Sequence, residues 1–123
     1  MEQNKICLDT DICIEIIKGN KPSRIEELSL QRVFISSVSV FELFLRESKL
    51  IEIENFIEDV EIMDFNEAAA KKASEIFKDL RKKGFMVDHR DVFIAAACII
   101  NNCSLITLNN KHFENIKELK VIS

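Results

Sequence analysis

The chain has 123 residues, so it has room for one domain, which we expect to span residues 1–123. Apolar residues make up 47% of the chain, which is enough to build a hydrophobic core. The net charge of −4 excludes an overall electrostatic attraction to nucleic acid, so a nucleic-acid ligand would need local basic patches.

Cysteine usage and apolar run lengths indicate the compartment. The four cysteines, Cys7, Cys13, Cys98 and Cys103, lie in or beside apolar runs and form no C-x-x-C pair. This pattern favours small buried hydrophobes over a zinc site or a disulfide framework. The longest apolar run, 92–100, is shorter than the about 20 residues that cross a bilayer, and the first residues do not resemble a signal peptide. We therefore expect a cytoplasmic protein with no membrane partner.

Strands and helices alternate along the first half of the chain. The apolar run at 6–8 is typical of a buried parallel strand. Asp11 can cap the helix that follows, and Pro22 can open the next helix. In chain order, the predicted elements are a strand at 6–8, a helix at 11–18, a helix at 22–30, a strand at 33–35, a helix at 38–49 and a further helical piece to 59.

The second half continues this alternation. Asn66 caps the clearest helix, which Gly84 ends and which has apolar residues at helical spacing along one face. These apolar residues are Ala69, Ala73, Ile76, Phe77 and Leu80. The other predicted elements are a strand at 60–65, a helix at 88–101, a strand at 105–107 and a strand at 120–122.

The alternation predicts an α/β fold with a parallel sheet of four to five strands and helices on both faces. In such sheets the active site lies beyond the carboxyl ends of the strands. Asp9 follows the first predicted strand and Asn109 follows the strand at 105–107, so both are expected at that edge.

Asp9 and Asp11 stand in the sequence ICLDTDI. A carboxylate just past the first strand of an α/β domain commonly serves as a metal ligand or a nucleophile. We favour that role for Asp9, because it directly follows three apolar residues and because one cap suffices for the helix. Asp11 is equally well explained as the helix cap.

Glu42 and Asp91 are further candidates. Glu42 lies in VSVFELFL (38–45), a helix that is apolar nearly all round and is expected to be largely buried, where a carboxylate needs a partner such as a cation. The alternative for Glu42 is a capping box with Ser39. Asp91 lies in the first turn of its helix, where the helix dipole keeps a carboxylate ionised. Its alternative is a favourable first-turn charge behind a cap at Asp88.

Four segments, taken in order, resemble the PIN-domain ribonucleases. The segment at 6–12, ICLDTDI, is similar to the family's first-strand motif, and ISSVSVFEL (35–43) to its second acidic segment. HRDVFIAAA (89–97) is similar to the third segment, and LITLNNKHFENI (105–116) to the closing one. Each motif alone is short, but together they form a specific signal. The compact length is typical of the VapC-type toxins of toxin–antitoxin pairs.

The resemblance implies an endoribonuclease that hydrolyses RNA phosphodiester bonds with Mg²⁺ or Mn²⁺. Carried over position by position, the metal-binding acids fall on Asp9, Glu42 and Asp91. The family often has a fourth acid in the closing segment, where this chain has Asn109 and His112. Asn109 could position a catalytic water there. With three firm acids, a second metal ion would be held weakly or only together with substrate phosphate.

The resemblance also implies protein partners, namely a second copy in a homodimer and a cognate antitoxin that covers the acidic cleft. Apolar side chains at Ile51, Ile53, Phe56 and Ile57 could supply a surface for them. Arg46 and Lys111 are candidates for contacts with the RNA backbone, and both are equally well explained as surface charges.

Two alternatives remain open. The first is a phospho-accepting receiver domain of a signalling pathway, with Asp64 after the third strand and Thr107 after the fourth. It leaves Glu42 unexplained and lacks a lysine directly after a fifth strand. The second alternative is a catalytically inactive, metal-free PIN-like binding module.

Overall fold

The structure is a computed structural model that describes residues 4–21 and 31–122. Its elements are β1 (Lys5–Leu8), α1 (Thr10–Ile17), β2 (Arg32–Ser36), α2 (Ser37–Phe44), α3 (Leu50–Glu58), β3 (Glu61–Met63), α4 (Glu67–Lys82), α5 (His89–Ile100), β4 (Ser104–Ile106), the 3₁₀ turn η2 (Asn110–His112) and β5 (Val121–Ile122). The helix predicted at 22–30 lies outside the described residues. The other predicted elements are present, although the helix predicted at 38–49 ends at Phe44.

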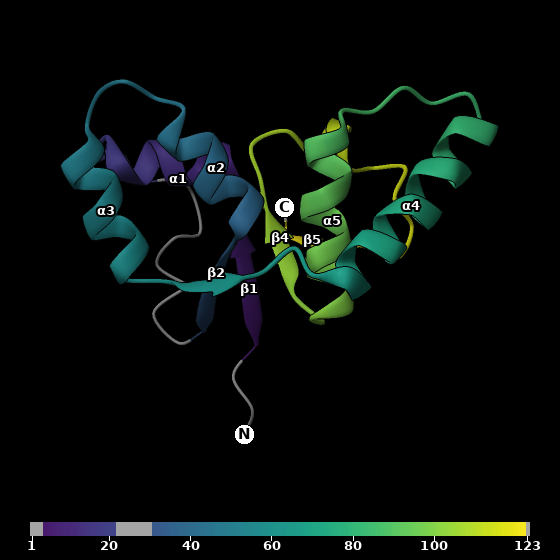
Figure 1. Cartoon of the computed structure of the whole chain (residues 1–123), viewed down its shortest axis with the longest axis horizontal. Helices are drawn as coiled ribbons and strands as arrows, with labels where there is room; N and C mark the ends of the chain where they lie inside the picture. Colours follow the sequence, from purple (N-terminus) through teal and green to yellow (C-terminus); the bar gives the residue numbers. More distant parts are fainter. Residues whose placement is uncertain (1–3, 22–30, 123) are drawn as a thin grey trace.

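The strands form one parallel sheet in the order β3-β2-β1-β4-β5, which confirms the α/β fold. Helices α1, α2 and α3 lie on one side of the sheet, and α4 and α5 lie on the other (Figure 1). Because side chains alternate along a strand, β1 supplies both cores. Ile6 and Leu8 pack in the core on the α1 side, whereas Cys7 packs in the core on the α5 side.

Polar side chains fix where the helices begin. The side chains of Ser36, Asn66 and Asp88 each accept a hydrogen bond from a backbone N–H in the first turn of α2, α4 and α5. The predicted caps at Asn66 and Asp88 are therefore confirmed. The proposed capping box of Ser39 and Glu42 is wrong, because Ser36 is the cap and α2 begins at Ser37.

Helix α2 is less buried than its sequence predicted. Phe41 and Leu45 are 56% and 59% exposed, and Leu43 is the fully buried apolar residue of this helix. The prediction failed because apolar periodicity does not reveal which sides of a helix have a packing partner. The expected surface on α3 also needs correction: Ile51 is 74% exposed, but Ile53 is buried in the core and cannot supply a surface.

Two structural findings concern the predicted buried cysteines and the predicted lack of a membrane-spanning segment. All four cysteines are free and buried, as predicted for small hydrophobes. Among the described residues, no helix combines the length and the apolarity that crossing a membrane requires.

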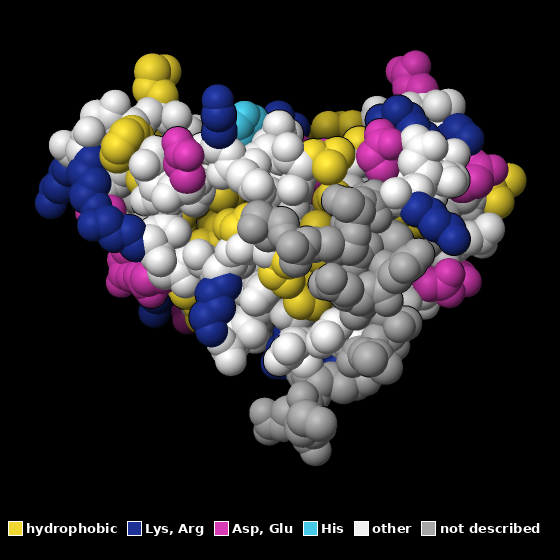
Figure 2. Space-filling model, turned by 180° about the vertical axis from the view of Figure 1, so that it is seen from behind, with side chains coloured by type: hydrophobic (Ala, Val, Ile, Leu, Met, Phe, Trp, Pro, Cys, Tyr) yellow, Lys and Arg dark blue, Asp and Glu magenta, His cyan; other side chains and the backbone are white. Residues whose placement is uncertain are grey.

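On the face seen from behind, hydrophobic side chains gather in the middle, and charges of both signs lie towards either end (Figure 2).

Candidate active site

The carboxyl end of β1 opens into a cleft of about 320 Å³. Asp9 reaches it from the end of β1, Glu42 from α2, Asp91 from α5 and Asn109 from the segment after β4. The cleft is also lined by Thr10, Asp11, Ile14, Asp88, Arg90 and His112. The structure therefore brings all four predicted site residues, which are far apart in the sequence, to one place.

Asp9 lies at the bottom of this arrangement and is 6% exposed. Its Oδ2 accepts a hydrogen bond from Thr107 Oγ1 at 2.7 Å, and its Oδ1 accepts one from the backbone N–H of Thr10 at 2.8 Å. Burial and the nearby charge of Asp11 nevertheless raise the pKa of Asp9 from 3.8 to about 6. The two hydrogen bonds thus orient the carboxylate but offset only part of the cost of ionising it.

Asp11 is not the helix cap, because α1 begins at Thr10 with Asp9 in the cap position. Instead, Asp11 connects α1 to the segment after β4. Its Oδ2 accepts hydrogen bonds from Leu108 N and Asn109 Nδ2, both at 3.1 Å, and lies 3.3 Å from Thr107 Oγ1, whose hydrogen points to the nearer Asp9. This link between positions almost 100 residues apart was not visible in the sequence.

Glu42 has two partners that the sequence analysis missed. Thr10 Oγ1 lies 2.7 Å from Glu42 Oε1 and 2.9 Å from Ser39 Oγ. Arg90 Nη1 lies 3.4 Å from Glu42 Oε2, and the Glu42 side chain is 20% exposed. The carboxylate is therefore half-buried and already contacts a cation from the protein itself.

Asp91 occupies the first turn of α5, as predicted. Its Oδ2 lies 3.2 Å from His112 Nδ1. Burial raises the pKa of Asp91, and the charges of Asp88 and Glu42 add to this effect, although His112 acts in the opposite direction. Asp88 accepts a hydrogen bond from the backbone N–H of Arg90 at 2.8 Å, which lowers the pKa of Asp88. Asp88 therefore serves the start of the helix, and Asp91 is the acid that faces the cleft centre.

The donor set fits a hard divalent cation. Carboxylate oxygens are the ligands that Mg²⁺ and Mn²⁺ prefer, and a cation would offset the cost of ionising Asp9 and Asp91, whose pKa values are raised first by burial and then by neighbouring acids. In residues 4–21 and 31–122, no three Asp, Glu, His or Cys side chains lie close enough together to hold a metal ion as they stand. Glu42 and Asp91 contact Arg90 and His112 instead. A cation would have to replace these contacts.

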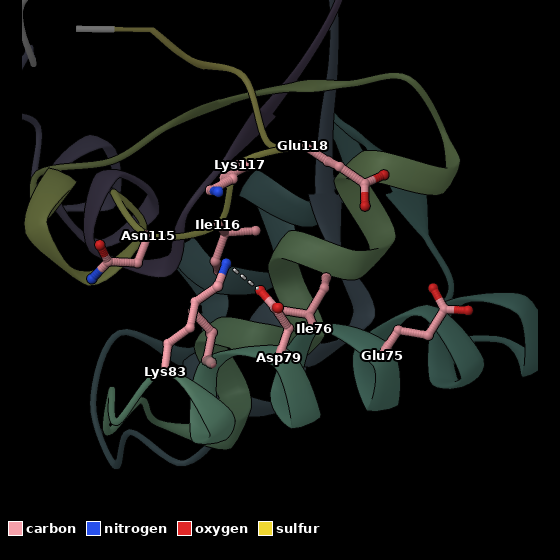
Figure 3. Close-up of a pocket in the computed structure, with 9 residues that line it drawn as sticks. Glu75, Ile76, Asp79, Lys83, Asn115, Ile116, Lys117 and Glu118 are labelled. Atoms are coloured by element: carbon pink, nitrogen blue, oxygen red, sulfur yellow. Dashed lines mark hydrogen bonds and ion pairs between the residues drawn. The ribbon is translucent and has the colours of Figure 1, made fainter.

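A larger hollow of about 400 Å³ lies elsewhere, between α4 and residues 115–118 (Figure 3). Its charged side chains are of both signs, and Lys83 Nζ donates to Asp79 Oδ2 at 3.0 Å along the end of α4. Because it does not contain a group of acids at the strand ends, we place the chemistry in the smaller acidic cleft.

Comparison with known families decides between the interpretations that the sequence left open. Residues 6–119 match the PIN domain. The chain belongs to the PIN-domain family. The resemblance noted in the sequence is thereby confirmed, and the receiver alternative is not favoured. In this PIN domain, Asp64 follows the edge strand β3, two strands away from β1 and Asp9.

Curated relatives and solved structures match nearly the whole PIN domain. Ribonuclease VapC1 of Methanocaldococcus jannaschii is 34% identical over 95% of this chain and 85% of the relative. The tRNA(fMet)-specific endonuclease VapC of Salmonella typhimurium is 33% identical over 95% of this chain and 96% of the relative. The DNA-bound VapBC structure from Salmonella typhimurium has a TM-score of 0.87 at 32% identity, covering 98% of both chains. VapBC2 from Rickettsia felis, bound to a promoter DNA fragment, has a TM-score of 0.86 at 26% identity, covering 96% and 97%.

Proposed function

We propose that this PIN domain is a metal-dependent endoribonuclease and the toxin of a toxin–antitoxin pair. The observation that carries the proposal is the convergence of Asp9, Glu42 and Asp91, from three separate elements, on one cleft at the carboxyl end of β1. Relatives at 33–34% identity carry the names of a ribonuclease and a tRNA endonuclease, which supports RNA as the substrate.

In this proposal Asp9, Glu42 and Asp91 hold Mg²⁺ or Mn²⁺. When bound, the cation lowers the pKa of water and offsets negative charge on the phosphate under attack. Thr107 and Thr10 keep the carboxylates of Asp9 and Glu42 in fixed orientations through their hydroxyl groups. These contacts reduce the reorganisation that binding would otherwise require.

The chain's other polar residues position the substrate and water. Asp11 holds the backbone of Leu108 and the amide of Asn109, so Asn109 is placed at the rim of the cleft to orient a water. Arg90 is 47% exposed, and once its guanidinium leaves both Glu42 and Asp88 it is free to contact an RNA phosphate. Lys111 and Arg46 are further candidates for backbone contacts.

The partners in this proposal are RNA, a cognate antitoxin and a second copy of the chain. Several of the similar structures are VapBC complexes, which favours an antitoxin for this chain. Of the surface first expected on α3, the exposed Ile51 remains, and Phe41 in α2 and Leu45 at its end add exposed apolar side chains to it. Free, buried cysteines fit a reducing cytoplasm. Light scattering that shows only monomer at micromolar concentration would count against the homodimer.

The proposal is tested by cleavage of single-stranded RNA with protein freed of metal by a chelator. We expect no cleavage before Mn²⁺ or Mg²⁺ is added and cleavage afterwards. Cleavage that continues without any divalent cation would overturn the metal dependence. Absence of both cleavage and stoichiometric Mn²⁺ binding would instead favour the inactive PIN-like module. Labelling of Asp64 by a small phosphodonor would favour the receiver.

A further inference from the structure

A second hollow, of about 190 Å³, adjoins the acidic cleft. Both are lined by Asp88, Asp91 and His112, so these three residues form a wall between neighbouring hollows. The far wall of the second hollow is formed by Phe85, Met86, Val87, Lys111 and Asn115. This hollow therefore has three apolar side chains beside a cation and an amide, whereas Ile14 is the one apolar residue that lines the acidic cleft.

The far wall leaves apolar surface uncovered. Phe85 is 41% exposed and Met86 is 99% exposed, although both lie in the short connection between α4 and α5. An exposed aromatic side chain beside a nuclease cleft offers a stacking surface for an unpaired base, whatever its sequence. The amide of Asn115 has both donors and an acceptor, as the edge of a base requires.

Charge decides how a nucleotide would lie in this hollow. Asp88 and Asp91, on the wall shared with the cleft, repel a phosphate, whereas Lys111 attracts one. A base therefore lies over Phe85 and Met86, with its phosphate towards Lys111. We propose that this hollow is the subsite for one unpaired nucleotide next to the cleaved bond, an inference that rests on the ribonuclease function proposed above.

Two features favour RNA over a protein segment as the occupant. The hollow shares three lining residues with the acidic cleft, so a strand whose phosphate is cleaved in the cleft lies within reach of it. Asn115 also lines the larger hollow beside α4, where Lys83 and Lys117 lie (Figure 3). A strand that left the subsite past Asn115 would meet Lys117 there, whereas Lys83 is paired with Asp79.

The chain has neither tryptophan nor tyrosine, so one introduced tryptophan reports on this hollow alone. Phe85→Trp would be combined with Asp9→Asn, which prevents cleavage, and titrated in Mg²⁺ with a single-stranded RNA hexamer. We expect saturable quenching of the fluorescence by base stacking. Phe44→Trp in the same background is the matched control, because Phe44 is 39% exposed but lies on α2, outside the hollow. It should show no quenching.

Kinetics on the otherwise unchanged protein provide the second readout. Phe85→Ala should raise KM for single-stranded RNA about tenfold and change kcat less than about twofold, whereas Phe44→Ala should change neither. Active protein with an unchanged KM in Phe85→Ala and no quenching in Phe85→Trp would overturn the subsite alone. If quenching occurs but the unmutated protein cuts no RNA, the proposed nuclease function fails and the subsite remains an RNA-binding site. Quenching by a cognate antitoxin peptide and not by RNA would assign the hollow to a protein and overturn the proposal.

Discussion

The carboxylates on the two sides of the acidic cleft have different kinds of contact partners. On the β1 side, Asp9 is buried, and its hydrogen-bond donors within residues 4–21 and 31–122 are neutral, namely Thr107 and the backbone of Thr10. On the helix side, Glu42 contacts Arg90 and Asp91 contacts His112. In the part of the chain that the structure describes, the carboxylate on the β1 side therefore has no cationic partner. The carboxylates on the helix side contact side chains that can carry positive charge. A divalent cation adds most at Asp9 and has to compete at Glu42 and Asp91.

The largest expected effect follows from removing an acid on either side. Asp9→Asn and Asp91→Asn should each reduce RNA cleavage at least about a hundredfold while the fold stays intact, because a neutral amide is a poor ligand for a hard cation. The measurement is initial cleavage rate together with circular dichroism. Asp64→Asn is the matched control, since Asp64 also follows a strand but is exposed at the sheet edge. Full activity in Asp9→Asn would contradict the assignment.

The next effect concerns the pH dependence of stability without metal. Because the pKa of Asp9 is raised from 3.8 to about 6, the folded protein binds this proton more tightly than the unfolded chain does. Ionised Asp9 then costs about 3 kcal/mol of folding free energy above pH 6, and the cost disappears as the pH falls towards 4. The metal-free protein should therefore gain stability from Asp9 between pH 7 and pH 4.

Urea unfolding at several pH values, with a chelator present, would measure this gain. Comparison with Asp9→Asn isolates the contribution of Asp9 from that of the other acids. Identical pH dependence in the two proteins would show that the environment of Asp9 does not disfavour its ionised form, and the contrast between the two sides of the cleft would be lost.

A smaller effect is expected on the helix side. Arg90→Gln removes the cation that contacts Glu42, so Mn²⁺ should bind about two- to fivefold more tightly, in line with the modest strength of a partly exposed ion pair. Cleavage at saturating metal should fall if Arg90 also contacts RNA. Calorimetry with Lys78→Gln, which removes an exposed charge from α4, provides the control. Weaker Mn²⁺ binding in Arg90→Gln would show that Arg90 organises the site rather than competing for it.

The smallest effect is expected at Asn109. Asn109→Asp should tighten Mn²⁺ binding about threefold, because an anionic oxygen is a better ligand for a hard cation than a neutral amide. Without metal the variant should be less stable by about 1 kcal/mol, because it sets a second carboxylate 3.1 Å from Asp11. Mn²⁺ titration and thermal unfolding check both halves. If His112→Asp tightens binding instead, His112 occupies the fourth position.

The sequence predicted the strand ends and the caps of α4 and α5, because these depend on local chemistry, but it placed the caps of α1 and α2 at the wrong residues. Asp9 after β1 and Asp91 in the first turn of α5 could be located from the apolar runs beside them. The partners of these acids could not be predicted. Arg90 and Glu42 belong to different helices, and Thr107 and Asp9 are 98 residues apart, so only the packing of the sheet brings them together.

The burial of α2 shows a second limit of the sequence. Glu42 was expected to need a cation because its helix looked wholly buried, but Phe41 and Leu45 beside it are exposed. Glu42 does line the cleft, although the premise that its helix is wholly buried was wrong. Apolar side chains on the surface and in the core give the same sequence pattern, and one chain without its partners cannot separate them.

The most direct test of the account is a calorimetric titration of Mn²⁺ into the metal-free protein, compared with Asp9→Asn. If the cleft is a divalent-cation site built around Asp9, the unmutated protein should bind at least one Mn²⁺ per chain and Asp9→Asn should bind it at least about tenfold more weakly. Equal Mn²⁺ affinity in the two proteins would contradict the central claim, because the cation would then lie away from the carboxyl end of β1.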